Sequence, residues 1–170
     1  DVAVTGVQTC ALPILQIFAQ TLEHALPSRD AARYDTVILV NVLEHIGDDR
    51  SALSAMRRIL RPGGHLLLFV PALAFLYSAF DRKVGHFRRY NLRDLRRLAE
   101  AAGFSIVKAR YFDVAGVLPW WLLNTLGGKT DFNPALVKLF DRAVVPVMRP
   151  VERLIPPPLG KNILLAAASL

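Results

Sequence analysis

Side chains that could bind a ligand or move a proton gather at two places in the sequence. Residues 41–45 place an asparagine, a glutamate and a histidine directly after an apolar run, and residues 86–90 contain a histidine, two adjacent arginines and a tyrosine. A neutral imidazole accepts a proton near pH 7, so His45 and His86 are candidate general bases toward a substrate hydroxyl. An arginine such as Arg89 can hold a phosphate or carboxylate through two parallel hydrogen bonds.

These residues also have structural interpretations, which stay open at this point. Glu44 and His45 could hydrogen-bond the backbone and hold their loop closed. We expect no metal site, because no second histidine or carboxylate lies at ligand spacing from His45 in the sequence. A cysteine-based metal site or disulfide is also not expected, because the sole cysteine, Cys10, lies near the N-terminus.

The elements that must position these residues lie between residues 34 and 71. Residues 37–40 and 66–70 are unbroken apolar runs, a pattern typical of strands buried on both faces of a parallel sheet. Between them, negative charge at residues 48–49 favours the start of a helix, and apolar residues then recur on one helical face. Residues 62–64, Pro-Gly-Gly, follow. We expect them to stop the helix and reverse the chain. The sequence therefore predicts a right-handed βαβ crossover.

Both predicted strands end at the same edge of the sheet. In open parallel sheets, ligands bind beyond the carboxyl ends of the strands. Residues 41–45 leave the first strand there, and residues 72–87 form a long excursion that leaves the second strand and returns to His86. A loop of that length usually has a function, so Tyr77 and the residues around His86 are predicted to lie over this edge.

Two stretches carry a resemblance to a known family. The pattern YDTVILVNVLEHI, followed by a helix and LRPGGHLLLFVP, resembles the second half of class I S-adenosylmethionine-dependent methyltransferases, and VGHFRRYNLRDLRRLAEAAGF resembles a subgroup widespread in bacteria. The resemblance covers residues 15–170. It implies an α/β, Rossmann-like, mostly parallel sheet with flanking helices and strand order 3-2-1-4-5-7-6, whose last strand is antiparallel. This chain would hold the fourth to seventh strands and lack the first ones.

The resemblance also assigns roles to the candidate residues. It implies S-adenosyl-L-methionine as the cofactor, lined by the residues that leave the first predicted strand, namely Val40, Asn41, Val42 and Leu43. The acceptor would be bound by polar residues of the two candidate stretches and of the excursion between them, namely Glu44, Tyr77, Arg88, Arg89 and Tyr90. His45 and His86 would be the catalytic residues.

The first residues require a separate interpretation. Residues 4–14, VTGVQTCALPI, match the translation of a common sequencing-library adapter. We therefore interpret residues 1–14 as a non-native segment and residues 15–170 as the C-terminal part of a single methyltransferase domain. On this interpretation the family's glycine-rich cofactor turn is missing, and we expect the chain made as written to be an inactive fragment that binds the cofactor poorly.

The second half of the sequence predicts further elements. Residues 91–103 read as a helix with Asn91 at its start, and residues 104–111 alternate as an edge strand does. Residues 114–126 are very apolar but too short to span a membrane, so they form either a core helix or an apolar lid or interfacial patch around Trp120 and Trp121. Residues 134–154 have helical spacing broken near two prolines, and residues 163–168 supply a last strand.

Two functions from different classes fit these observations. The first is methyl transfer by the full-length parent to a small-molecule or lipid- or sugar-linked acceptor, in the cytoplasm and with membrane-surface contact left open. The second is a basic binding module, because the net charge is +7 and residues 82–97 carry seven Lys or Arg. Such a module would dock on anionic membrane, or less favourably on nucleic acid. Arginines that converge on the strand ends favour the first function, whereas a continuous outer stripe favours the second.

Overall fold

The structure is a computed structural model that describes residues 32–131 and 133–170. The adapter-like segment lies outside the described residues. In chain order the described elements are β1 (Tyr34–Val40), η1 (Leu43–His45), α2 (Asp49–Ile59), β2 (Leu60–Pro71), η2 (Ala74–Leu76), α3 (Ala79–Lys83), α4 (Leu92–Ala101), β3 (Phe104–Phe112), α5 (Val117–Trp120), η3 (Trp121–Leu126), α6 (Pro134–Ala143), α7 (Val145–Leu154) and β4 (Asn162–Ser169).

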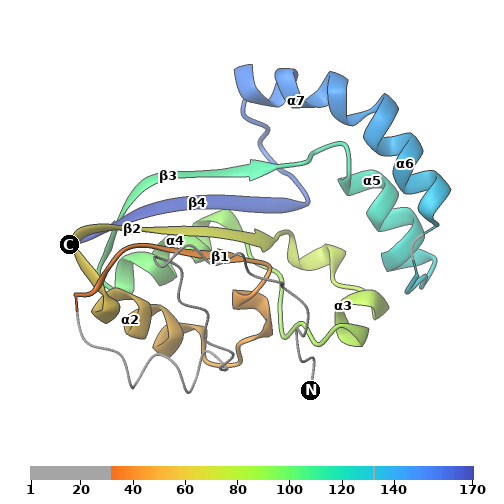
Figure 1. The fold of residues 1–170 in the computed structure, drawn as a ribbon. Helices are drawn as coiled ribbons and strands as arrows, with labels where there is room; N and C mark the ends of the chain where they lie inside the picture. The colour runs from red at the N-terminus through yellow and green to blue at the C-terminus, as the bar shows by residue number, and fades with distance from the viewer. Residues whose placement is uncertain (1–31, 132) are drawn as a thin grey trace, which may run out of the picture.

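The described strands form one sheet in the order β1-β2-β4-β3 (Figure 1). β1 and β2 pair in parallel, from Thr36 opposite His65 to Val40 opposite Phe69. β4 runs antiparallel to both β2 and β3, so β3 points in the same direction as β1 and β2. The α/β class, the mostly parallel sheet, the antiparallel last strand and the edge position of β3 are all confirmed.

The crossover between β1 and β2 follows the predicted order. The Asp48 side chain accepts a hydrogen bond of 3.0 Å from the Ser51 N–H and so caps α2. The prediction that residues 62–64 form a separate reversal is wrong, because β2 already begins at Leu60. Gly63 has φ +75°, and a Cβ on Gly64 would lie 3.1 Å from the Asp35 carbonyl oxygen. The glycines thus let this part of β2 lie close against the start of β1.

The core lies between the sheet and the helices α2 and α4, which Figure 1 shows together on one side of the sheet. Its fully buried side chains include Leu53, Met56, Leu66, Leu68, Leu95, Ile163 and Leu165. Side chains alternate between the two faces of a strand, and Ile38 and Val40 of β1 are 64% and 59% exposed. The expectation that both faces of this strand are buried is therefore wrong for the described structure, because α2 and α4 cover only the face of Leu39.

Two details of the second half differ from expectation. Asn91 is the residue before α4, as predicted, but its side chain does not cap the helix; the Leu92 N–H donates instead to the Tyr111 hydroxyl at 3.2 Å. Residues 72–87 are also not one irregular loop, since they contain η2 and α3.

The apolar stretch around the two tryptophans does not form a core helix. It folds as α5 and the π-helix η3, and Leu118, Leu122 and Leu126 are exposed. Of the two predicted interpretations, the exposed apolar patch is the one that the structure shows. No helix among the described residues is long and apolar enough to cross a membrane.

Candidate active site

The residues that leave β1 lie at the carboxyl edge of the sheet, as predicted. Asn41 has φ +51°, and its N–H donates to the Phe69 carbonyl at 2.8 Å, so it still pairs with β2. The side chains of Val40, Asn41 and Val42 are exposed, whereas that of Leu43 is fully buried in the core. A cofactor at this edge could touch the first three side chains, but only the backbone of Leu43.

Asp81 is the centre of a buried polar cluster over this edge. Its carboxylate accepts hydrogen bonds from the Arg89 Nε at 2.9 Å and from the Ser78 N–H and hydroxyl, both at 2.8 Å. The His86 Nδ1 lies 2.8 Å from the same carboxylate. The Ser78 contacts arise from the local S-x-x-D spacing at the start of α3, in which the carboxylate turns back to the first N–H of the helix.

Contacts within this cluster shift the pKa values of its members. Burial raises the pKa of Asp81, but the hydrogen bonds from Arg89 and His86 and the nearby guanidinium charge more than offset it, so its pKa lies below the usual range. Burial lowers the pKa of Arg89, and Asp81 opposes that change. Asp81 is therefore an ionised carboxylate and the acceptor in each of these bonds.

Glu44, His45 and His86 come together beside Asp81. One ligand-capable atom from each of these three side chains lies within 4.8 Å of the other two. The two imidazole rings meet edge to face with centroids 4.6 Å apart. Burial and the neighbouring His86 lower the pKa of His45, while the Gly85 backbone opposes this, so the His45 ring is neutral at pH 7.

Hydrogen bonds hold the two candidate stretches against each other. The Phe87 N–H donates to the Glu44 carbonyl at 2.8 Å. The Asp49 carboxylate accepts from the Tyr90 hydroxyl at 3.0 Å and from Arg88 at 2.8 Å. Burial, the Asp49 charge and the bond to Asp49 raise the pKa of Tyr90. The predicted meeting of residues 41–45 and 86–90 at one sheet edge is what the structure shows.

The residues assigned to the acceptor mostly use their polar groups within the protein. The Tyr77 hydroxyl donates to the His86 carbonyl at 2.7 Å. Arg89 is 7% exposed, and its guanidinium also lies 4.5 Å from the centre of the Trp120 ring. The acceptor-binding role of Tyr77, Arg88, Arg89 and Tyr90 stays a prediction, with each side chain already engaged by a neighbour.

Sequence reasoning missed two features of this cluster. Asp81, its central residue, has a local signal in its S-x-x-D spacing from Ser78. The expectation of no metal site rested on spacing along the chain around His45 alone. His86, however, lies 41 positions after His45, and the fold brings it beside His45 and Glu44.

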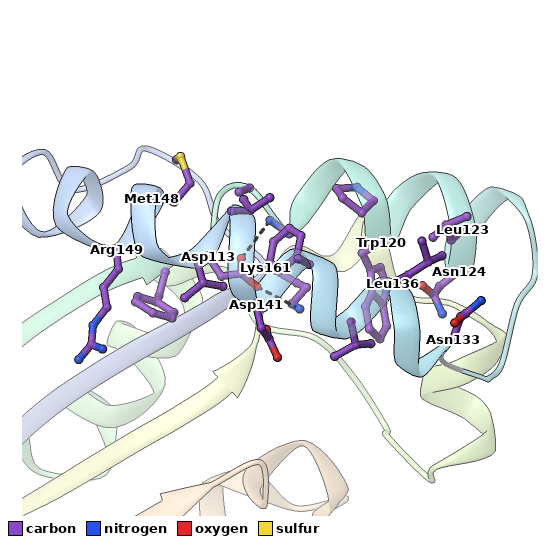
Figure 2. A pocket seen from close by; sticks show the side chains of 18 of the residues that line it. Asp113, Trp120, Leu123, Asn124, Asn133, Leu136, Asp141, Met148, Arg149 and Lys161 are labelled. Carbon is purple, nitrogen blue, oxygen red and sulfur yellow. Dashed lines mark hydrogen bonds and ion pairs between the residues drawn. The ribbon is translucent and has the colours of Figure 1, made fainter.

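A cavity of about 530 Å³ lies beyond the carboxyl end of β3 (Figure 2). It is bounded by α5 and η3 on one side and by α6 and α7 on the other, and its walls are mostly apolar, formed by residues such as Trp120, Leu123, Leu136, Val137, Phe140, Val144, Val145 and Met148. Its volume is in the range of sites that bind small molecules. Local sequence patterns did not predict it, because the enclosure depends on how α5, η3, α6 and α7 are arranged in space.

Buried polar contacts connect α7 and Lys161 to the residues that follow β3, at the base of this cavity. Glu152 of α7 is 3% exposed and accepts the N–H groups of Asp113 at 3.0 Å and Val114 at 2.7 Å. Lys161 pairs with Asp113 at 3.0 Å, and its Nζ lies 5.5 Å from the centre of the Trp120 ring. Because Trp120 also contacts Arg89, this one side chain separates the cavity from the Asp81 cluster.

The basic residues of positions 82–97 divide into two groups. Arg88 and Arg89 turn inward to carboxylates, as described above. Arg93, Arg96 and Arg97 lie on the exposed face of α4, and Arg82 and Lys83 are exposed in the last turn of α3. The arginines therefore do not form one continuous outer stripe, which is the arrangement that a basic docking module would need.

Comparisons with known proteins identify the family. A sequence model described as a methyltransferase domain matches residues 4–109, more than half of the chain. The chain belongs to this methyltransferase family. S-adenosylmethionine is the cofactor of the family, in agreement with the resemblance seen in the sequence.

Relatives and solved structures agree with the assignment. A protein of Mycolicibacterium smegmatis named "probable S-adenosylmethionine-dependent methyltransferase" is 35% identical over 83 residues, which are 48% of this chain and 32% of that protein. A ubiquinone biosynthesis O-methyltransferase of Alkalilimnicola ehrlichii is 31% identical over 72 residues, 39% of this chain and 29% of that protein. The chain thus aligns with about a third of the length of each curated relative.

The fold is similar to those of crystallised methyltransferases. An S-adenosylmethionine-dependent methyltransferase of Archaeoglobus fulgidus superposes with a TM-score of 0.55 at 15% identity, covering 88% of this chain and 65% of that one. One from Mesorhizobium loti gives a TM-score of 0.51 at 12% identity, covering 84% of this chain and 66% of that one. At these identities the likeness concerns the fold.

Proposed function

We propose that the parent protein transfers a methyl group from S-adenosylmethionine to a small-molecule or lipid- or sugar-linked acceptor that has an apolar portion. The observation that supports this most is the apolar cavity beyond β3. It lies at the sheet edge where β1 and β2 also end, and Trp120 borders both the cavity and the Asp81 cluster. An acceptor could place its apolar portion in the cavity and its reacting group toward His45 and His86.

The described residues fit one wall of a cofactor site. Val40, Asn41 and Val42 are exposed at the carboxyl end of β1, where the family binds its cofactor, and they offer apolar surface and one amide. The bound cofactor supplies an electrophilic methyl group. The remaining walls of such a site are not among the described residues.

The protein's own part in the reaction is to align the acceptor and to take its proton. His45 is exposed and neutral at pH 7, so it can accept a proton from an acceptor hydroxyl. His86 is held by Asp81 with its other ring nitrogen directed toward Glu44. Burial of the apolar portion excludes water and fixes the orientation, which is where most of the rate gain of such a transfer arises.

The test uses the parent protein expressed from its genomic reading frame, with methyl-labelled S-adenosylmethionine and hydroxyl acceptors that differ only in the length of an apolar tail. We expect kcat/KM to rise with tail length, and Leu123→Asp to remove that dependence because Leu123 lines the cavity. Leu122→Asp, on the neighbouring exposed position, is the control. Equal kcat/KM for all tails, or equal effects of both substitutions, would refute an acceptor site in this cavity.

Asn41 tests the cofactor side of the same proposal. We expect Asn41→Ala to weaken binding of S-adenosylmethionine by the parent protein while the KM for the acceptor stays near its original value. The reverse pattern, with an altered acceptor KM and unchanged cofactor affinity, would place Asn41 on the acceptor side instead.

A further inference from the structure

We infer that Glu44, His45 and His86 form a binding site for a divalent transition-metal ion such as Zn²⁺. The three side chains come from two segments, the turn after β1 and the segment before α4, and their ligand atoms lie within 4.8 Å of one another. Zinc–nitrogen and zinc–oxygen bonds are about 2.0 to 2.2 Å long, so two ligands of one ion lie at most about 4.4 Å apart. Binding would therefore require these side chains to close in by some tenths of an ångström. The inference concerns metal binding alone. While an ion is bound, His45 cannot also accept the acceptor's proton, because both roles use the lone pair of its ring.

The state of Glu44 is the first argument. Its side chain is fully buried, and neither carboxylate oxygen has a hydrogen-bond partner among the described residues. The His86 Nε2 lies 3.9 Å from the Glu44 Oε1, which is too long for a hydrogen bond. A buried carboxylate without a partner is strongly unfavourable, and an ion between Glu44 and His86 would compensate it.

The orientation of His86 is the second argument. Its Nδ1 lies 2.8 Å from the Asp81 carboxylate oxygen that also accepts a hydrogen bond from the Arg89 Nε at 2.9 Å. The proton of a neutral His86 ring is therefore on Nδ1, which leaves the lone pair of Nε2 on the side of Glu44. A carboxylate that fixes the tautomer of a ligand histidine in this way is a common partner around protein zinc ions.

The ligand set indicates the kind of ion. Two imidazoles and one carboxylate suit Zn²⁺, Fe²⁺, Co²⁺ or Mn²⁺, whereas Mg²⁺ and Ca²⁺ prefer oxygen ligands. The charge of a divalent ion also suits the site. Two carboxylates, those of Glu44 and Asp81, lie near one guanidinium, that of Arg89, so a divalent ion would offset the excess negative charge. His45 is exposed, which gives an ion a path from solvent and leaves room for a further ligand.

The competing explanation of the same geometry is a protonated Glu44. Burial raises the pKa of this carboxyl, and its own backbone N–H, followed by the charges of His86 and Arg89, opposes the rise. A neutral Glu44 would need no ion. The two explanations differ in whether Zn²⁺ binds and in whether Glu44 contributes to that binding.

The experiment titrates the 170-residue chain with ZnCl₂ by calorimetry, after removal of metal by a chelator and without cofactor or acceptor. All variants carry Cys10→Ser, so that the thiol cannot bind the ion. We expect one Zn²⁺ per chain and at least tenfold weaker binding in Glu44→Gln and His45→Ala. The control is His65→Ala, in which Zn²⁺ binding should be unchanged, because His65 is an exposed histidine on β2 away from the cluster. Asp81→Asn is expected to weaken binding by about 10- to 100-fold through His86.

A second measurement guards against misfolded variants. In the 170-residue chain without a substitution in the cluster, Zn²⁺ should shift the ring nitrogen signals of His45 and His86 in nuclear magnetic resonance spectra and leave those of His65 in place. The far-ultraviolet circular dichroism should stay unchanged. Absence of Zn²⁺ binding, equal affinities in Glu44→Gln and the parent, or ring shifts at His65 alone would overturn the site and leave a protonated Glu44 as the explanation.

Discussion

The two parts of the carboxyl edge of the sheet differ in how they are built. The Asp81 cluster is buried and polar, and hydrogen bonds connect Ser78, His86 and Arg89 to a single carboxylate. The cavity beyond β3 is mostly apolar, and its outer helices α6 and α7 leave many apolar side chains exposed, including Leu139, Val147 and Leu154. Hydrogen bonds and ion pairs hold the Asp81 cluster together, whereas the cavity has only a few buried polar contacts beneath apolar walls.

This difference implies different mechanical behaviour. A buried network in low dielectric holds its members in one geometry, because a displaced group would lose a strong partner. Helices that bury little apolar surface of their own, by contrast, contribute little to stability and can separate at low cost. The cluster thus suits a task that needs fixed groups, and the cavity suits apolar groups of variable shape.

The largest expected effect comes from removing the centre of the cluster. Asp81→Ala leaves the Arg89 guanidinium buried without its partner, which should lower the free energy of unfolding by about 3 to 5 kcal/mol. Urea unfolding of the 170-residue chain measures it. The control is Asp35→Ala in the exposed pair with Arg61, where we expect at most about 1 kcal/mol. Similar losses in both variants would show that the cluster is no more tightly held than a surface ion pair.

The corresponding change in the cavity is Glu152→Ala. It leaves the N–H groups of Asp113 and Val114 without an acceptor, for an expected cost of about 2 to 3 kcal/mol. We expect most of the loss to appear as faster hydrogen exchange in α6 and α7, with the exchange of β2 little changed. Asp141→Ala, on an exposed residue that also lines the cavity, should leave exchange unaltered. Equal acceleration in β2 would mean that both parts unfold together.

Trp120 tests the contact between the two parts. Trp120→Phe removes the bond from its ring N–H to the Leu76 carbonyl, 3.0 Å long, and weakens the stacking with Arg89. We expect a loss of about 1 to 2 kcal/mol in the free energy of unfolding. The adjacent Trp121→Phe, on an exposed ring, should change it by less than about 0.5 kcal/mol. Equal free energies of unfolding for the two variants would show that Trp120 does not stabilise the contact between the cluster and the cavity.

The smallest effect is a pH dependence at Glu44. Burial raises the pKa of this carboxyl in the folded chain, so between pH 4.5 and that raised value the folded state holds more protons than the unfolded state. Stability from this group is therefore present below pH 4.5 and is lost as pH rises through the folded value. With a chelator present, Glu44→Gln should become more stable relative to the parent as pH increases above 4.5. A constant difference between the two chains across this range would contradict the shift.

The sequence by itself determined the order and type of the main elements around the site. The βαβ unit, the edge strand after α4 and the last strand were predictable because apolar periodicity and helix-end residues act over a few positions. The same local signals carried the family resemblance and placed residues 41–45 and 86–90 at one sheet edge. They did not determine burial: residues 37–40 have the pattern of a fully buried strand, yet Ile38 and Val40 are exposed.

Only the tertiary structure decided which side chains meet. Glu44 and His86 are 42 positions apart, and their approach depends on how α3 folds back over the turn after β1. Arg89 looked like a free anion-binding group, but the fold turns it inward to Asp81 and Trp120. The cavity is lined by residues between positions 112 and 161, but it encloses space only through the way β3, α5, η3, α6 and α7 are arranged around it. Pairing of side chains and enclosure of space are set by distances across the fold, and local patterns carry no record of those distances.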